Sequence, residues 1–195
     1  GLKRIQEKLH YFPKDIWLYM LASEWMKISQ EEPFVGRCGH VKDDLGSKVI
    51  AARLVQSIMK LCFLMEKQYT PYSKWFGTAF SRLKCAKKLS PVLNKILTSK
   101  QWKKREKYLS QAYKLLAEMH NNLKLTKPLA TDVSSFHDRP YLVIHGDLFS
   151  KELKKLIKDP AVKKISADIG SVNQLSNTID LLVNNELLKK LKVLY

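Results

Sequence analysis

The sequence predicts an all-α protein, a helical bundle with a smaller C-terminal helical subdomain and at most one short strand. The chain is 45% hydrophobic, as globular proteins are, and its 7 glycines and 7 prolines are few for a many-turned β-sandwich or a disordered chain. Its apolar side chains also recur at intervals of three and four residues over long stretches, which is typical of helices. We expect a bundle over residues 1–125 and a helical extension over residues 126–195 packed on it, forming a single domain overall.

A short opening helix is expected to end before Pro13, which suits the first position of a second helix because it lacks an N–H group. Glu24 falls on the apolar face of that second helix and is either half exposed at its edge or a buried acid with a partner. The other residues of this face, which continues to about residue 30, are Trp17, Met20, Leu21, Trp25 and Ile28. Residues 31–46 are polar, contain three glycines and break the helical period, so we expect a loop there.

The most hydrophobic helix is expected over about residues 47–68, and it is apolar nearly all round, which places it at the centre of the bundle. Its polar residues Arg53, Ser57 and Lys60 form a narrow stripe. Arg53 is expected to be a semi-buried cation that faces a partner acid or a cleft. Because two cations interrupt the apolar run over 49–65, that run predicts a core helix rather than a membrane span.

Pro71 interrupts the chain, and a helix is expected to run from there to about residue 84. Residues 90–97 begin with Ser-Pro, which is typical of the cap and first position of a short helix. A long helix follows over about residues 100–124. Its expected inward-facing residues are Leu109, Ala112, Tyr113, Leu116 and Ala117.

The last third of the chain begins with a polar, proline-containing linker over residues 126–139. Residues 140–145 form a short apolar run that is the one candidate strand, and a lone strand needs a partner. Helices are expected over about residues 148–158, 173–183 and 185–194.

Charge is the unusual property of this chain: 35 Lys and Arg against 18 Asp and Glu give a formal net charge of +17. Such a surplus attracts nucleotides, RNA, acidic lipids or acidic protein faces without choosing among them, and it also serves simple solubility. The expected long helix gathers five lysines on one face, which is either an electrostatic footprint for nucleic acid or a solvated face. They are Lys100, Lys103, Lys104, Lys107 and Lys114.

Three cysteines, odd in number and far apart, indicate no disulfide framework, so a reducing cytoplasm is expected. Cys38 and His40 offer two metal ligands with no second pair at zinc-site spacing, so no metal site is expected. Residues 1–10 alternate charged and apolar side chains, which predicts neither a secretory signal nor a membrane partner. The chain starts with Gly1 inside an expected helix, which fits either a piece of a longer protein or a removed tag.

The segment His145-Gly146-Asp147, followed 21 residues later by Asp168, resembles the aspartate pair of aminoglycoside phosphotransferases and protein kinases. In those enzymes the first Asp takes the acceptor proton and the second binds magnesium. Here Glu152 stands where a metal-binding Asn is expected, and no glycine-rich phosphate loop precedes. No Asp-x-Asp follows a Gly-Ser pair either, so we expect no self-contained catalytic centre.

Two clusters attract attention as binding sites. The polar stretch over residues 30–44 joins two apolar helices and must emerge at one end of the bundle, where functional residues concentrate. The second cluster is Tyr69, Tyr72, Lys74 and Trp75, in which aromatic faces can stack on a base or sugar while the lysine meets a phosphate. The plain alternatives are a helix-joining loop and aromatics packed in a corner of the core.

These clusters carry a family resemblance. The segments 11–15 (YFPKD), 30–34 (QEEPF), 51–55 (AARLV) and 69–75 (YTPYSKW) look like the uncharacterised helical domain that follows a nucleotidyltransferase-type head in many prokaryotic proteins. Further matching pieces are His120-Asn121, Arg139-Pro140, residues 169–174 and Leu194-Tyr195. The resemblance spans nearly the whole chain, whereas the head itself is missing from it.

By that resemblance, the head would hold the metal-binding carboxylates, Mg²⁺ and a nucleoside triphosphate. The helical domain would close the cleft and bind the acceptor, as the helical halves of aminoglycoside nucleotidyltransferases do. The candidate cleft residues are Arg37, Lys42, Arg53, Tyr72, Lys74 and Trp75. The cations would hold phosphate or an anionic acceptor, and Trp75 would stack or pack.

The resulting hypothesis is an accessory, acceptor-binding domain that is not catalytic alone and whose head partner is joined in cis or in trans. The alternatives are a basic RNA-binding module, a kinase-like phosphotransferase fragment and a protein-interaction domain. The acceptor and the nucleotide stay open.

Overall fold

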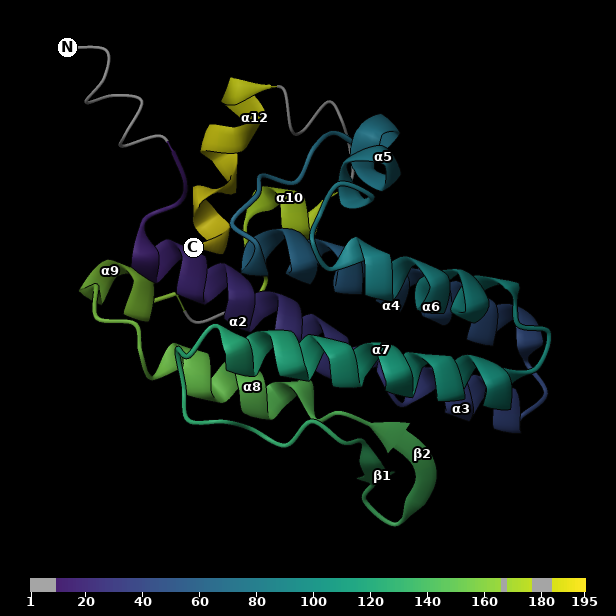
Figure 1. The fold of residues 1–195 in the computed structure, drawn as a ribbon. Coiled ribbons are helices and arrows are strands. Elements are labelled where there is room, and N and C mark those ends of the chain that lie inside the picture. Colours follow the sequence, from purple (N-terminus) through teal and green to yellow (C-terminus); the bar gives the residue numbers. More distant parts are fainter. Residues whose placement is uncertain (1–9, 166–167, 177–183) are drawn as a thin grey trace.

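The computed structural model describes residues 10–165, 168–176 and 184–195. Within these ranges the chain is mostly helical, with a single small two-stranded sheet (Figure 1). The predicted fold class is therefore confirmed. The expected opening helix lies outside the described residues, as does most of the helix expected over 173–183.

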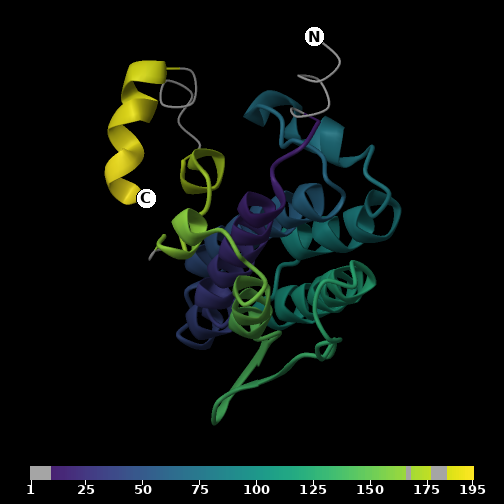
Figure 2. The ribbon, with the colours of Figure 1, turned by 90° about the vertical axis from the view of Figure 1, so that its left-hand side faces the viewer.

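Helix α2 (Lys14–Glu31) lies at the centre, with α4 (Asp44–Met65) on one side and α8 (Gly146–Lys154) on another (Figures 1 and 2). Every residue from position 17 to position 25 of α2 is buried, so this half is covered all round rather than on one face. The predicted apolar face is confirmed, since its five members are each at most 5% exposed. Pro13 immediately precedes the helix, where its missing N–H is harmless.

Residues 31–46 are not the expected loop. Helix α3 (Phe34–His40) lies within them, α2 and α4 reach into them from either side, and Asp43 caps α4 by accepting a hydrogen bond from the Gly46 N–H at 2.7 Å. The glycines of α3 serve close packing: a Cβ on Gly36 would lie 2.5 Å from the Tyr141 ring, and one on Gly39 2.1 Å from the Trp102 ring. Neither aromatic partner is near in sequence, so the local pattern looked like a break.

Helix α4 is buried along much of its length and forms part of the central core, as its composition predicts. No helix in the described parts of the chain is both long and apolar enough to cross a membrane. After α4, a 3₁₀ turn η1 (Ser73–Trp75) and a short α5 (Phe76–Phe80) replace the longer helix expected up to residue 84.

Helices α6 (Ala86–Thr98) and α7 (Trp102–Asn122) pack against each other and against α4. The five predicted inward-facing residues of α7 are all at most 2% exposed, which confirms that face. Helix α6 begins earlier than expected and contains Pro91 in its interior. The Glu66 carboxylate accepts the backbone N–H groups of Lys84 and Cys85 at 2.9 and 2.8 Å, so its start is held from the end of α4.

The sheet is an antiparallel hairpin of β1 (Ser134–Phe136) and β2 (Arg139–Val143), with Ser134 opposite Val143. Strand β2 confirms the predicted apolar run, but at most one strand was expected. Its partner comes from the expected linker, because ladder hydrogen bonds join backbone groups and need no apolar pattern in a polar edge segment.

The rest of the C-terminal part comprises the short helices α9 (Pro160–Lys163), α10 (Val172–Leu175) and α12 (Asn185–Lys190) and the 3₁₀ turn η2 (Leu191–Leu194). Buried residues of α8 belong to the same core as those of α2 and α4. The division at residue 125 stays a prediction.

Glu24 is the buried acid with a partner, not the half-exposed one: it is 0% exposed, and burial raises its pKa. The Gln174 side-chain amide donates to a Glu24 carboxylate oxygen and to the Met20 carbonyl, both at 2.9 Å. Lys60 donates to the Asn173 carbonyl at 2.8 Å. These bonds hold the segment around α10 on α2 and α4.

Replacing Gln174 with Ala should therefore destabilise the whole fold, because it removes the hydrogen bonds that the side-chain amide donates to the buried Glu24 carboxyl group and to the Met20 carbonyl. We expect a loss of about 2 kcal/mol in the free energy of unfolding, measured by urea denaturation. Asn94→Ala, on the exposed side of α6, is the control and should change stability by less than about 0.5 kcal/mol. Equal stability of the two variants would show that this segment does not support the core.

Candidate nucleic-acid interface

The His-Gly-Asp motif forms the turn that leads from β2 into α8 and has a structural role there. His145 has a left-handed backbone (φ 58°), and a Cβ on Gly146 would lie 2.6 Å from the Trp25 carbonyl oxygen. The Glu32 carboxylate accepts the N–H groups of Ile144 at 2.6 Å and Gly146 at 3.2 Å. The motif thus ties the end of α2 to the β2–α8 turn.

The second aspartate of the kinase-like comparison is already engaged in an ion pair. Asp168 forms an ion pair with Lys154 at 2.8 Å. Lys154 lies seven residues after Asp147 on α8, which separates their Cα atoms by about 10 Å. In the described part of the chain, no three His, Cys, Asp or Glu side chains gather as a metal site would require.

The six cleft candidates are spread along the whole length of α4: two precede it, Arg53 lies near its middle and three follow it. Arg37 lies in α3, Lys42 between α3 and α4, and Arg53 in α4, where it pairs with Glu31 while its side chain stays 58% exposed. The other three, Tyr72, Lys74 and Trp75, follow the opposite end of α4. This helix has 22 residues and spans about 33 Å, so the candidates do not line one common cleft.

The α7 lysines also separate into two groups. Lys100, Lys103, Lys104 and Lys107 are exposed at or just before the start of α7. Lys114 lies further along the helix and pairs with Asp132 at 2.7 Å. Of these five lysines, Lys114 alone forms an ion pair within the described residues.

Near the start of α7, the structure joins residues from both candidate sets. Lys42, Lys100 and Lys103 line one hollow of about 400 Å³, together with Gly39, Asp44, Gln101 and Trp102. A second hollow of about 350 Å³ shares Lys100 and Gln101 with the first. Its other lining residues are Lys95, Thr98, Ser99, Lys104 and Tyr108.

We call this surface the basic end, defined by Lys42, Lys95, Lys100, Lys103, Lys104 and Lys107. Two aromatic rings accompany its lysines: the Lys103 ammonium lies 5.7 Å from the Trp102 ring centroid, and that of Lys95 lies 5.6 Å from the Tyr108 ring centroid. Sequence reasoning missed Lys95, Trp102 and Tyr108 because their role depends on neighbours from other helices.

Arg105 holds the basic end in place. It is 0% exposed, donates to the Ser99 carbonyl at 2.7 Å and to the Ser47 hydroxyl at 3.1 Å, and pairs with Asp44. Lys48 also pairs with Asp44 at 2.7 Å, and the hydrogen bonds from Lys48 and Arg105 lower the pKa of that carboxyl group. The one acid lining the two hollows is thus already paired, so the surrounding lysines are not neutralised by it.

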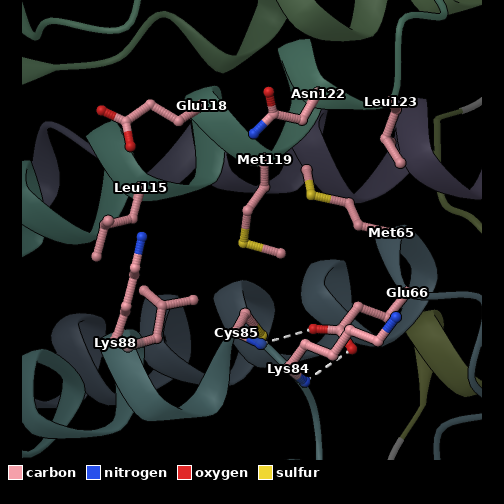
Figure 3. Close-up of a pocket in the computed structure, with 11 residues that line it drawn as sticks. Met65, Glu66, Lys84, Cys85, Lys88, Leu115, Glu118, Met119, Asn122 and Leu123 are labelled. Carbon is pink, nitrogen blue, oxygen red and sulfur yellow. Dashed lines mark hydrogen bonds between the residues drawn. The ribbon is translucent and has the colours of Figure 1, made fainter.

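A different pocket, of about 340 Å³, lies between the end of α4, the start of α6 and the second half of α7 (Figure 3). Its apolar lining residues are Met65, Leu89, Leu115, Met119 and Leu123. Lys84, Lys88, Glu118 and Asn122 also line it, so opposite charges meet there. Unlike the basic end, this pocket is lined by both positive and negative side chains. It contains none of the predicted site residues.

A family model described as a domain of unknown function (DUF4037) matches residues 1–76, so this part of the chain is similar to an uncharacterised domain. No curated protein and no solved structure matches the chain.

The buried Glu32 carboxyl group should make the free energy of unfolding depend on pH. Burial raises the pKa of Glu32 from 4.5 to about 7, so between these values the folded chain holds a proton that the unfolded chain has lost. Its contribution to the free energy of unfolding therefore falls as pH rises through this window. Relative to Glu32→Gln, the wild type should lose about 2 kcal/mol between about pH 5 and about pH 7.5, measured by urea denaturation.

His120 works in the opposite direction, because burial lowers its pKa from 6.5 to about 4 and its contribution to stability rises with pH over that range. Since both proteins carry His120, its effect cancels in the difference between them. A difference that does not change with pH would contradict the raised pKa of Glu32.

Proposed function

We propose that this chain is an accessory, acceptor-binding helical domain of a nucleotidyltransferase-type protein, and that its acceptor is a nucleic acid held at the basic end. The observation that carries the proposal is the hollow in which Lys42, Lys100 and Lys103 converge beside Trp102. Lysines bind phosphate oxygens and an aromatic face can stack on a base or sugar.

The size of the basic end favours a polyanion over a single nucleotide. Its two hollows adjoin through Lys100 and Gln101, and together they place five lysines along one surface. A mononucleotide would engage one hollow, whereas a chain of phosphates engages both and releases counterions from each contact. The net charge of +17 adds long-range attraction for the same kind of ligand.

The proposed role as the accessory domain of a nucleotidyltransferase-type protein rests on the family resemblance. The family model covers residues 1–76, which include Arg37, Lys42, Arg53 and the aromatic cluster, although its description assigns no activity. In this proposal, a nucleotidyltransferase-type head in cis or in trans supplies the catalytic carboxylates, Mg²⁺ and the nucleoside triphosphate. The three free cysteines suit a reducing cytoplasm, and the resemblance is to prokaryotic proteins.

Binding of a fluorescently labelled RNA to the purified chain, followed by anisotropy over a salt series, tests the proposal. The double variant Lys100→Ala/Lys103→Ala should bind more weakly, and the slope of log K against log salt should fall by about 2, because two phosphate contacts are lost.

The matched control is Lys163→Ala/Lys164→Ala, which removes the same charge from exposed positions at the end of α9. This control should keep most of the affinity and the original slope. Equal weakening by both pairs would show diffuse attraction to net charge rather than a site, and absence of RNA binding would remove nucleic acid as the acceptor.

A further inference from the structure

An exposed group of aromatic side chains lies beyond the far end of α4. Tyr69, Tyr72 and Trp75 are 50%, 49% and 56% exposed. We call Tyr72 and Trp75, with Lys74 between them, the aromatic platform. The Lys74 ammonium lies 5.5 Å from the centroid of the Trp75 ring, so a cation and an exposed aromatic face occupy the same spot.

The platform is anchored to the core on both sides. Before it, the Tyr69 ring contacts those of Tyr11 and Phe12, with centroids 5.3 and 5.0 Å away. After it, Phe76 stacks on the buried Phe63 at 5.6 Å. A fixed backbone lowers the conformational entropy lost when a ligand stacks on these rings.

A stretch of chain whose charged residues are all positive connects this platform with the basic end. Residues 67–105 contain eleven lysines and arginines and not one aspartate or glutamate. Helix α6 lies within this stretch and runs from beside α5 towards the end of the bundle where α3 and the start of α7 lie (Figure 1). It exposes Lys87, Lys88 and Lys95 along the way.

We infer that the aromatic platform is a stacking subsite for unpaired bases, and that the ligand of this protein is a single-stranded nucleic acid. Its phosphates would follow the α6 lysines to the basic end. This inference rests on the proposed function and narrows its acceptor from nucleic acids in general to single strands. A duplex keeps its bases stacked on each other and offers no free face to the platform, whereas a single strand does.

The surrounding charge favours this ligand over an apolar protein segment. Lys74 lies beside the exposed Trp75 ring, and Lys67 is exposed where it contacts the buried Trp17 ring at 4.5 Å. Over residues 67–75, cations therefore alternate along the chain with exposed aromatic rings. The neighbouring acid Glu66 is engaged by two backbone N–H groups, those of Lys84 and Cys85. Alternating cations and aromatic faces match alternating phosphates and bases.

The test uses the full chain and three labelled probes of equal length: a single-stranded RNA, an RNA duplex and a single strand without bases. A length of about 12 nucleotides exceeds what the 13 residues of α6 require, since the helix spans about 20 Å and a helical strand rises about 3.4 Å per nucleotide. The wild type should bind the single-stranded RNA at least about tenfold more tightly than the strand without bases.

The double variant Tyr72→Ala/Trp75→Ala should lose about tenfold in affinity for the single-stranded RNA. Its affinity for the duplex and for the strand without bases should stay unchanged, and so should its salt slope, because every lysine remains. Tyr72→Phe/Trp75→Phe should retain binding, since phenylalanine keeps the stacking face. Phe136→Ala, in the hairpin, serves as a control aromatic deletion away from the platform.

The outcomes separate the two proposals. Equal binding of all three probes, with no effect of the aromatic variant, would overturn the stacking subsite while leaving the basic end as a phosphate site. No binding of any probe would overturn the proposed function itself. A DNA strand that binds as well as RNA would support the subsite, because stacking does not involve the sugar. An aromatic variant that loses a co-purifying protein but keeps RNA binding would assign the platform to a protein interface instead.

Discussion

The fold depends on burying α2 together with Glu32, the residue that follows it. Glu24, Glu31 and Glu32 are buried acids, and each needs a partner from another part of the chain. Glu24 is engaged by Gln174, Glu31 by Arg53, and Glu32 by the backbone N–H groups of residues 144 and 146. Burying an unsatisfied acid costs several kcal/mol, so the core forms fully only when the C-terminal segment, α4 and the β2–α8 turn are all in place. One helix thereby ties together segments up to about 150 residues apart.

The pairing of acids within the fold also affects the charge of the surface. Several carboxylates already have partners within the fold: Glu24, Glu31 and Glu32, Glu66 at the start of α6, and Asp44 beside Arg105. The exterior is one-sidedly positive along α6 and the start of α7, because residues 67–105 contain no aspartate or glutamate. Acids are paired within the fold, whereas lysines are exposed on this part of its surface. The surface is therefore suited to polyanions.

Periodicity predicted the long helices well. α2, α4 and α7 begin and end within a few residues of their expected bounds, because apolar spacing along a long helix directly reflects which side is buried. It failed where a remote residue decides the local structure. α3 looked like a loop because its glycines pack against Tyr141 and Trp102, and α6 starts early because Glu66 holds its first turn. Strand β1 was missed because its pairing uses backbone groups.

The candidate site was only partly foreseeable for the same reason. The sequence by itself determined the helical class, the apolar face of α2, the central burial of α4, the surplus of positive charge and the chemical types of the binding residues, because composition and local spacing are properties of the chain. The tertiary structure alone decided that Lys42 meets Lys100 and Lys103, that Trp75 lies far from Arg37, and that the His-Gly-Asp motif forms a turn beside Glu32. Which distant segments meet is decided by packing and by the pairing of buried charges, and neither is written in the spacing of neighbouring residues.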